Sequence, residues 1–383
     1  MNNIKLKKSE GETFYIKERG IPKGCKYCLK GSKVVLFLNG ICQKPDYCSW
    51  YCPISEERKA KNFTFANEIE ISSKDELLKE INTIKAKGMS ITGGEPLSEL
   101  NFRKTIEYIK YVKSKKGDKF HVHVYTNGID FNENKAKMLS AVGLDEIRFH
   151  PSKENWFLIE KALNKNIDVG AEVPVIPEKE NINNLENFIL FLNKIGVDFI
   201  NLNEFEFCFP NSQNLKDRGF KLKKDSIGSV INSYEAGLDI IRQLGPKVSM
   251  KMHFCTTKAK DFYQLKNRYI RRAKNIRLPF EVITEEGLLI FGQIEGEKEK
   301  LAEFYKILIS ERIITEKLIT FDGKNIKLPF YVAIQTNFEN LLKKYELKGY
   351  IVEMIPFRIP KYQQITEKTP IKVFRKEYGF NGS

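Results

Sequence analysis

The sequence lacks the features that mark membrane and secreted proteins. No run of about 18 apolar residues occurs in its 383 residues, so we expect no transmembrane helix. Residues 1–20 are polar and charged, and no apolar stretch follows their lysines, so we expect no secretory signal. These absences predict a cytoplasmic protein that does not contact a membrane.

Acidic residues are also in short supply. Lysine and arginine number 64 against 49 aspartates and glutamates, which leaves a formal charge of +15. Such an excess favours an anionic partner, such as RNA, a phosphorylated metabolite or an acidic protein surface. Because the lysines are scattered along the chain, a lysine-rich solvated surface explains the charge equally well.

Histidine is scarce, with four residues, but cysteine is not. Five of the seven cysteines fall between positions 25 and 52. The total is odd and the protein is expected to be cytosolic. A cluster of this kind therefore indicates a metal rather than disulfides.

Short apolar, β-branched runs alternate with helical patterns over most of the chain. Strands are predicted at residues 33–38, 89–92, 121–125, 146–149, 169–175 and 199–204, and helices at residues 74–87, 101–115, 133–142, 155–165 and 185–195. This alternation predicts an α/β fold with a parallel sheet, in the form of a barrel or partial barrel. A helix near 227–244 precedes a candidate seventh strand at 248–254.

The pattern changes after residue 277. Apolar runs at 280–283 and 288–294 flank Thr-Glu-Glu-Gly and predict a β-hairpin. A helix at 297–310, strands at 325–334 and 350–355 and a helix at 337–345 follow. We therefore expect three parts: an N-terminal cysteine-knuckle segment (1–32), a barrel domain (33–277) and a C-terminal α+β domain (278–383).

Three cysteines, Cys42, Cys48 and Cys52, directly follow the first predicted strand of the barrel. Three thiolates on one loop can hold three irons of a cubane and leave the fourth iron open to an exogenous ligand, whereas ordinary cubanes take four cysteines. An open iron can chelate S-adenosylmethionine (SAM), and one electron then releases a 5′-deoxyadenosyl radical. A zinc loop or buried structural cysteines would fit the spacing as well.

A Gly-Gly-Glu-Pro turn ends the second predicted strand. Gly93 and Gly94 allow the backbone to approach a ligand closely, and Glu95 can accept a hydrogen bond from an ammonium group. Alone this is an ordinary strand-to-helix turn. The turn indicates a ligand site only because it lies one βα unit after the cysteine loop.

With these two motifs the sequence resembles the radical SAM superfamily over residues 20–203. The resemblance implies a partial (β/α)6 TIM-like barrel and a [4Fe–4S] cluster on Cys42, Cys48 and Cys52. It also implies SAM bound by Gly93, Gly94 and Glu95, and a one-electron reductase such as a ferredoxin or flavodoxin. The spacing departs from the common C-x3-C-x2-C pattern, since here it is C-x5-C-x3-C.

A closer resemblance is to an uncharacterised archaeal branch related to pyruvate formate-lyase activating enzyme. It rests on Ile-Pro-Lys-Gly-Cys at 21–25 with Cys28, Glu-Ile-Arg-Phe-His-Pro at 146–151 and Asn-Leu-Asn-Glu at 201–204. That branch supplies no function to carry over.

Further polar residues lie on the later predicted strands or at their ends. Asn127 is either a SAM ligand or part of an Asn-Gly turn. Arg148 and His150 share a face of their strand, where Arg148 suits the SAM carboxylate or a structural ion pair. Glu172 and Asn203 need buried partners, which SAM would supply.

A second metal site is expected from a C-x2-C knuckle. Cys25 and Cys28 precede the first barrel strand, and Cys255 with His253 are the obvious further ligands. Zinc and an auxiliary iron–sulfur cluster fit about equally well, and an empty pair of thiols is the simpler alternative. Cys208 has no partner in the sequence.

A dense basic run at residues 266–277 predicts a basic helix that can neutralise phosphates. Beside a small α+β domain it suits RNA docking, so RNA, in particular tRNA modification, is the first expectation for the substrate. A peptide or protein substrate, including activation of a glycyl-radical enzyme, is the alternative. A zinc-containing RNA-binding protein without catalysis would explain the cysteines but not the Gly-Gly-Glu-Pro turn.

Overall fold

The computed structural model describes residues 4–44 and 46–379 of the chain. It divides into two compact units, of which the first ends at Leu265 and the second begins at Lys266. The division precedes the expected boundary at residue 277, because the basic helix α8 (Leu265–Ile276) groups with the second unit apart from its first residue.

The first unit is built on an eleven-stranded sheet within the described residues. In chain order its strands are β1 (Leu6–Lys8), β2 (Phe14–Ile16), β3 (Lys33–Phe37), β4 (Thr64–Ala66), β5 (Ile69–Ile71), β6 (Gly88–Thr92), β7 (His121–Thr126), β8 (Glu146–Phe149), β9 (Asp168–Val175), β10 (Phe199–Glu204) and β11 (Lys251–Cys255). They are arranged β1-β2-β11-β10-β9-β8-β7-β6-β3-β4-β5. The seven strands from β11 to β3 are parallel, which confirms the predicted α/β fold and shows the seventh strand.

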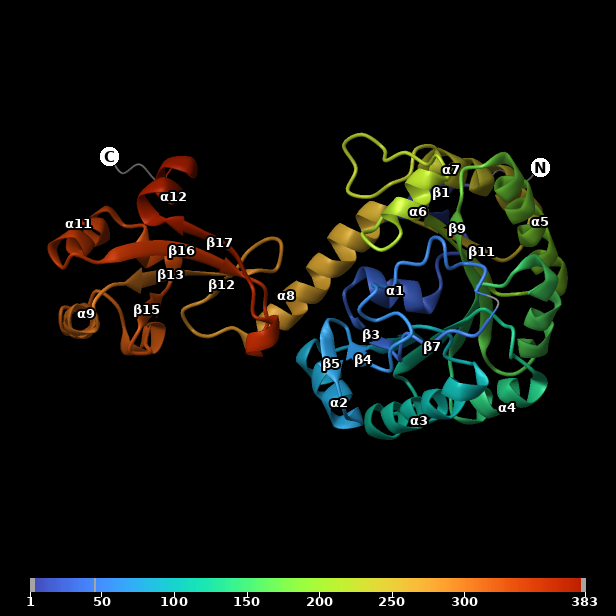
Figure 1. The fold of residues 1–383 in the computed structure, drawn as a ribbon, viewed down its shortest axis with the longest axis horizontal. Coiled ribbons are helices and arrows are strands. Elements are labelled where there is room, and N and C mark those ends of the chain that lie inside the picture. Colours follow the sequence, from blue (N-terminus) through green and yellow to red (C-terminus); the bar gives the residue numbers. More distant parts are fainter. Residues whose placement is uncertain (1–3, 45, 380–383) are drawn as a thin grey trace. The chain divides into compact units, whose positions relative to one another are not determined.

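The sheet is open, since β11 and β3 pair with the antiparallel strands β2 and β4 rather than with each other. The connecting helices are α2 (Lys74–Thr83), α3 (Glu99–Lys116), α4 (Glu133–Ala141), η1 (Lys153–Ala162), α5 (Lys179–Ile195) and α7 (Ser233–Leu244). Figure 1 shows the sheet curved around the short helix α1 (Lys23–Leu29), with α2 to α5 on its outer side. Residues 4–32 are thus integrated into the first unit.

Local sequence signals explain where these helices begin. Ser73 and Glu76 form a reciprocal capping box at the start of α2, and the Ser98 hydroxyl accepts from the Asn101 N–H at the start of α3. The strands are rich in valine and isoleucine, and their apolar side chains form one large core with the outer helices. This scaffold aligns the carboxyl ends of seven strands along one edge.

Two expected elements differ in type or extent. The helix expected at 155–165 is the 3-10 segment η1, and Asn164 and Asn166 just beyond it adopt positive φ angles that no helix continues. The helix expected at 227–244 begins only at Ser233, because residues 220–231 form turns held by isolated bridges.

The second unit has an antiparallel sheet, as the α+β pattern predicted. Its strands within the described residues are β12 (Val282–Ile283), β13 (Leu289–Glu295), β14 (Thr320–Phe321), β15 (Asn325–Leu328), β16 (Lys348–Met354) and β17 (Ile365–Pro370). Its later helices include α9 (Lys298–Ser310), α10 (Phe330–Ala333), α11 (Thr336–Lys344) and α12 (Ile371–Glu377). The strand expected at 325–334 stops at Leu328, because Pro329 lacks an N–H for the ladder and begins α10 instead.

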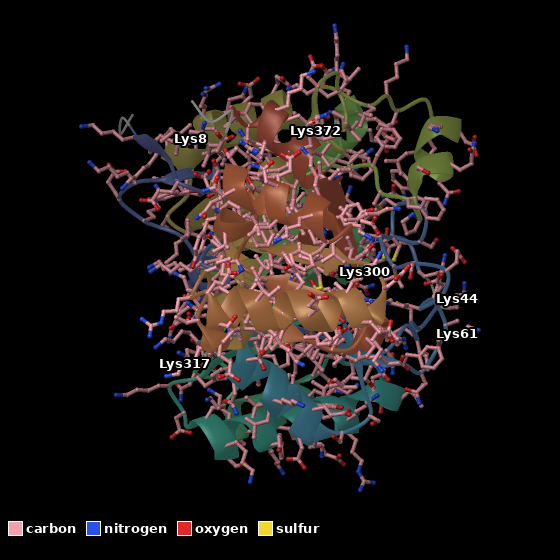
Figure 2. The ribbon with its side chains drawn as sticks, turned by 90° about the vertical axis from the view of Figure 1, so that its left-hand side faces the viewer. Lys8, Lys44, Lys61, Lys300, Lys317 and Lys372 are labelled. Carbon is pink, nitrogen blue, oxygen red and sulfur yellow. The ribbon has the colours of Figure 1, made fainter. Side chains whose placement is uncertain are left out.

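The surface carries its positive charge in dispersed form. Figure 2 labels lysines from both units, such as Lys8, Lys61 and Lys372, whose side chains project away from the ribbon. In the second unit part of the basic run is used internally, since Arg272 is buried with its guanidinium 4.2 Å from the centre of the Phe357 ring. Among the described residues, no helix has the length and apolar character needed to cross a membrane.

Candidate functional site

The three-cysteine motif lies on the loop between β3 and β4, at the carboxyl edge of the sheet. We call residues 38–63 the cluster loop. Cys48 and Cys52 are half-buried, and Cys42 is exposed as a residue although its sulfur is partly shielded. Burial, followed by the neighbouring thiols, raises the pKa of Cys42 to about 12 and that of Cys48 to about 11.

Within the described residues, no group of three or more His, Cys, Asp or Glu side chains is arranged to hold a single metal ion. The three loop thiols nevertheless have the donor chemistry of an iron–sulfur cluster, which takes thiolates one iron at a time. A three-thiol loop fits a cubane with one open corner, and it does not present the closed four-ligand set of structural zinc.

The two glycines of the Gly-Gly-Glu-Pro turn bring β6 and the cluster loop together. A Cβ on Gly94 would lie 2.0 Å from the Ile41 carbonyl oxygen, and Gly93 has a φ of +134°. The N–H of Gly94 donates to Asn39 O (2.7 Å) and that of Glu95 donates to Ile41 O (3.0 Å). The close approach that glycine permits is thus to the chain just before Cys42.

Glu95 is buried at this junction. Its carboxylate accepts hydrogen bonds from the Thr126 hydroxyl (2.7 Å), the Asn127 N–H (2.7 Å) and the Leu97 N–H (2.9 Å). Burial raises the pKa of Glu95 to about 7 despite these donors. Glu95 therefore links the turn after β6 to the turn after β7.

Asn127 forms the Asn-Gly turn after β7. Its side-chain oxygen accepts from the Ile129 N–H at 3.0 Å, and Gly128 has a φ of +82°. This is the local Asx turn that the sequence allowed as an alternative to a ligand role. The backbone N–H of Asn127 donates to Glu95, so this turn lies beside that carboxylate at the carboxyl edge.

Arg148 and Glu172 form a buried ion-pair network inside the curved sheet. Arg148 donates to Glu146 from Nε (2.6 Å) and to Glu172 from Nη1 (2.5 Å). Glu172 also accepts from Asn201 (2.9 Å) and Asn203 (3.0 Å). The pKa values of Glu146 and Glu172 fall to about 2: burial alone would raise them, and the Arg148 charge together with the hydrogen bonds to each carboxylate outweighs burial. The structure thus has the ion pair that the sequence allowed for Arg148.

His150 lies at the end of β8, against the cluster loop. Its Nε2 is 2.7 Å from the Tyr51 hydroxyl, and the two rings are stacked with centroids 6.0 Å apart. Burial lowers the pKa of His150 to about 4, so the ring is neutral. Tyr51, directly before Cys52, is thereby attached to the sheet.

A pocket of 360 Å³ opens beside this contact. It is lined by aromatic and apolar side chains from the cluster loop, β9 and α5, with a few polar groups at the start of α5; they include Tyr51, His150, Trp156, Pro174, Asn181 and Asn184. Convergent polar groups in an apolar pocket are typical of a small-molecule site. Of the candidate SAM residues predicted from the sequence, His150 lines this pocket.

The residues of the expected second metal site converge between α1 and β11. Gln264 lies between two of the thiols, with Oε1 2.6 Å from Cys28 Sγ and Nε2 3.5 Å from Cys255 Sγ. Cys25 Sγ is 3.5 Å from Asn201 Oδ1. His253 bonds the same Asn201 oxygen through Nδ1. Two of the thiols, Cys28 and Cys255, therefore meet at a glutamine that the sequence did not suggest, while Cys25 contacts Asn201.

Buried histidines make the stability of the first unit depend on pH. Burial lowers the pKa of His123 well below its usual 6.5, and neither ring nitrogen has a hydrogen-bond partner in the described part of the chain. The folded unit therefore binds fewer protons than the unfolded chain below pH 6.5, and its stability falls as the pH drops. Between pH 6.5 and 5 we expect His123→Phe to reduce the fall in the free energy of unfolding by about 1.4 kcal/mol per pH unit. Urea unfolding at several pH values checks this, and parallel curves for variant and parent would contradict it.

Comparison with known proteins identifies the family. A family described as a 4Fe-4S single cluster domain matches residues 30–149. The chain is 38% identical over 355 residues to a Methanocaldococcus jannaschii protein named as a candidate glycyl-radical enzyme activating enzyme, and the match covers 88% of this chain and 90% of that protein. The chain belongs to the radical SAM superfamily. It is therefore a [4Fe–4S] enzyme, as the two motifs predicted, and it is related to pyruvate formate-lyase activating enzyme, as the closer resemblance implied.

The solved structures that match this radical SAM enzyme are more distant relatives in sequence. Streptococcus suis SuiB bound to S-adenosylmethionine has 11% identity and a TM-score of 0.41 over 59% of this chain and 50% of that one. Escherichia coli coproporphyrinogen III oxidase (HemN), described as a radical SAM enzyme, has 10% identity and a TM-score of 0.34, over 86% and 94% of the two chains.

Sequence reasoning missed two asparagines around the motifs of this radical SAM enzyme. Asn101 donates to Ile41 O (3.3 Å) and Glu95 O (2.9 Å), so one amide holds both motif loops. Asn211 bonds the cluster loop at Tyr51. Asn101 sits within a helical pattern and Asn211 within a polar loop, where asparagine is common, so no sequence signal marks either one.

Proposed function

We propose that this enzyme reductively cleaves SAM and uses the 5′-deoxyadenosyl radical to modify a polypeptide, most specifically to activate a glycyl-radical enzyme. The observation that carries the proposal is the relation to the M. jannaschii protein along nearly the whole chain, second unit included. The alignment thus reaches beyond the unit that carries the cysteine and Gly-Gly-Glu-Pro motifs.

In this proposal Cys42, Cys48 and Cys52 would hold the [4Fe–4S] cluster. When bound, the cluster supplies the open iron and the electron that cleave SAM. The curved, open sheet, which we interpret as a partial (β/α)6 barrel, presents its carboxyl edge to both groups.

The same edge supplies the residues that we propose for SAM. They are Gly93, Gly94 and Glu95 on the turn after β6, with Asn127, His150 and Asn203 nearby. Glu95 keeps its orientation through three hydrogen bonds, and the neutral His150 ring holds Tyr51. We assign Arg148 and Glu172 to the internal ion pair instead, because each side chain is already neutralised by an oppositely charged partner inside the first unit.

A polypeptide substrate is favoured over RNA. The M. jannaschii relative is named for the activation of a glycyl-radical enzyme, which is a protein, and Arg272 of the basic run is buried within the second unit. The dispersed lysines suit an acidic protein surface as well as they suit a nucleic acid. We further propose a one-electron reductase, a ferredoxin or flavodoxin, as a partner.

The test combines two assays under strict anaerobiosis. Reconstituted, reduced enzyme is incubated with SAM and a glycyl-radical enzyme from the same organism, and 5′-deoxyadenosine and the electron paramagnetic resonance (EPR) spectrum are measured. We expect 5′-deoxyadenosine together with a glycyl-radical doublet on the added protein. A salt-dependent shift of tRNA, without any radical on the polypeptide, would contradict the proposal.

We also propose that the thiols around Gln264 form a second metal site, for zinc or an auxiliary iron–sulfur cluster. Support comes from the convergence of Cys25, Cys28 and Cys255 from segments more than 200 residues apart. Binding would require the Gln264 side chain to leave its place between Cys28 and Cys255. Zinc and iron analysis of a variant without the three loop cysteines tests this site, since metal retained there must lie elsewhere.

A further inference from the structure

An irregular stretch of chain that follows β10, the strand next to the last parallel strand β11, lies against the cluster loop. We call residues 205–232, between β10 and α7, the bracing segment. It contains the short helix α6 (Ser212–Asp217) and is closed on itself by bridges from Glu206 to Ser229 and from Leu222 to Val230. β10 and β3 are separated by four strands in the sheet, so this contact connects two distant parts of the carboxyl edge.

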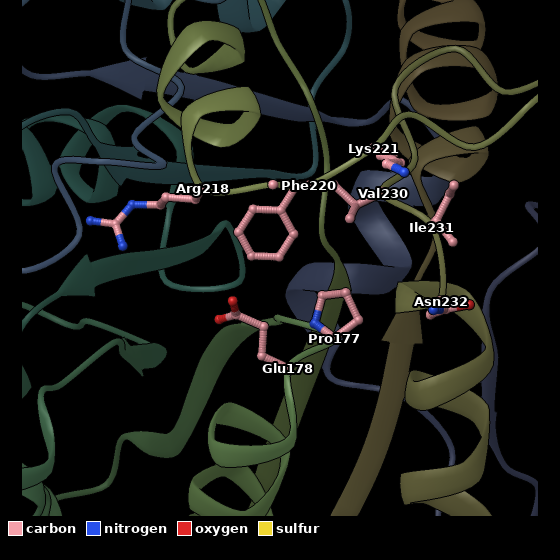
Figure 3. Close-up of a pocket in the computed structure, with 9 residues that line it drawn as sticks. Pro177, Glu178, Arg218, Phe220, Lys221, Val230, Ile231 and Asn232 are labelled. Atoms are coloured by element: carbon pink, nitrogen blue, oxygen red, sulfur yellow. The ribbon is translucent and has the colours of Figure 1, made fainter.

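Apolar packing forms one part of the contact. Trp50 of the cluster loop stacks on Phe220, with centroids 6.0 Å apart and planes 13° apart, and packs edge-on against Phe205. The Arg218 guanidinium carbon lies 4.3 Å from the Trp50 ring centre. Figure 3 shows Arg218 and Phe220 also lining a pocket of 270 Å³, so this packing borders open space.

A single buried amide forms the polar part. Asn211, with 2% of its surface exposed, donates from Nδ2 to Tyr51 O (3.1 Å) and to Glu206 O (3.2 Å). Its Oδ1 accepts from the Cys208 N–H at 2.9 Å. Tyr51 is therefore held at both ends, by Asn211 at its carbonyl and by His150 at its hydroxyl.

The position of Asn211 in its own helix shows that this arrangement overrides a local preference. Asn211 is the N-cap residue of α6, where an asparagine side chain ordinarily accepts from an N–H of the first helical turn. Here the side chain makes no capping bond. The amide is used instead to join two loops, which is what is expected where a tertiary requirement wins over local structure.

We propose that Asn211 is a positioning residue for the iron–sulfur cluster. By fixing the Tyr51 carbonyl it sets the path of the chain into Cys52, and the bracing segment thereby keeps the three thiols gathered at the carboxyl edge. The proposal rests on the assignment of Cys42, Cys48 and Cys52 as the ligands. Removing the amide leaves a half-buried carbonyl without this donor at the residue before a ligand, so the cluster becomes easier to lose and its environment changes.

The test compares Asn211→Ala with Asn214→Ala. Asn214 is an exposed asparagine three residues later on the same helix and serves as the matched control. Anaerobically reconstituted proteins are treated with an iron chelator, and the loss of visible absorption is followed. We expect Asn211→Ala to bleach roughly tenfold faster than the parent, with an altered EPR spectrum of the reduced cluster, and Asn214→Ala to match the parent in both.

A third variant separates the bonds that Asn211 makes. Asn211→Asp can still accept from the Cys208 N–H but cannot donate to Tyr51 O, so we expect it to bleach at least as fast as Asn211→Ala. A folded Asn211→Ala protein with the parent's bleaching rate and EPR spectrum overturns the proposal. If Asn211→Ala does not fold, Arg218→Ala weakens the brace at Trp50, and parental behaviour of that variant overturns it. A parent protein that takes up no cluster contradicts the ligand assignment instead.

Discussion

We expect Cys48→Ala protein to lack the visible absorption of the loop cluster and to be unable to cleave SAM. A cubane with one open corner depends on all three thiolates, so removal of one leaves two irons without protein ligands. We expect the loss of about four irons per chain, and 5′-deoxyadenosine formation lower by roughly a hundredfold or more. Iron analysis, the visible spectrum and product quantification after anaerobic reconstitution measure these effects.

Cys208→Ala is the matched control for this result. Cys208 is a half-buried thiol of the bracing segment that lies outside the three-cysteine loop. We expect that variant to keep its iron and its product formation, because only backbone atoms of Cys208 take part in the Asn211 contact. Both variants should keep the parent's far-UV circular dichroism. Full 5′-deoxyadenosine production by Cys48→Ala would remove Cys48 from the ligand set.

Arg148→Met is expected to destabilise the first unit by about 3–5 kcal/mol. Arg148 is 2% exposed and neutralises Glu146, which is fully buried, as well as Glu172. Methionine keeps most of the volume but leaves two carboxylates without their cation. Urea unfolding followed by tryptophan fluorescence reports on this unit alone, because both tryptophans, Trp50 and Trp156, belong to it.

The pH dependence of this loss has a definite sign. In the parent the pKa values of Glu146 and Glu172 are held at about 2, so their contribution to stability is present above pH 4.5 and is lost as the pH falls toward 2. In Arg148→Met the carboxylates can take up protons, so the difference from the parent should shrink at low pH. Arg103→Ala, which removes an exposed pair with Glu107, should cost less than about 0.5 kcal/mol. Equal losses for the two variants would contradict a buried network.

The sequence predicted the parts of the fold that depend on local pattern. Valine- and isoleucine-rich runs bounded by polar turns predicted β3 and β6 to β10, and Gly-Gly-Glu-Pro marked the end of β6 because few other sequences allow such a close turn. The hairpin of β12 and β13 followed from its four-residue turn.

Long-range contacts account for what the sequence did not predict. Arg148 could serve SAM or an ion pair: Glu146 is two residues away on the same strand, but only the fold brings Glu172 to it. Gln264 reaches Cys28 across 236 residues of sequence, and Asn211 reaches Tyr51 across 160. The predicted helix at 227–244 included the end of the bracing segment, and this part was wrong. The apolar residues of the segment pack around Trp50 and do not form a helix face.

The placement of the N-terminal residues also constrains how the first unit is made. β2 pairs with β11, and the Thr256 hydroxyl donates to the Glu12 carbonyl across 244 residues of sequence. During synthesis, the strand that β1 and β2 need as an edge leaves the ribosome only after nearly the whole unit has been translated. The nascent chain therefore carries an unpaired hairpin for most of its elongation, and the slow closure of this long loop is a natural point for chaperone assistance.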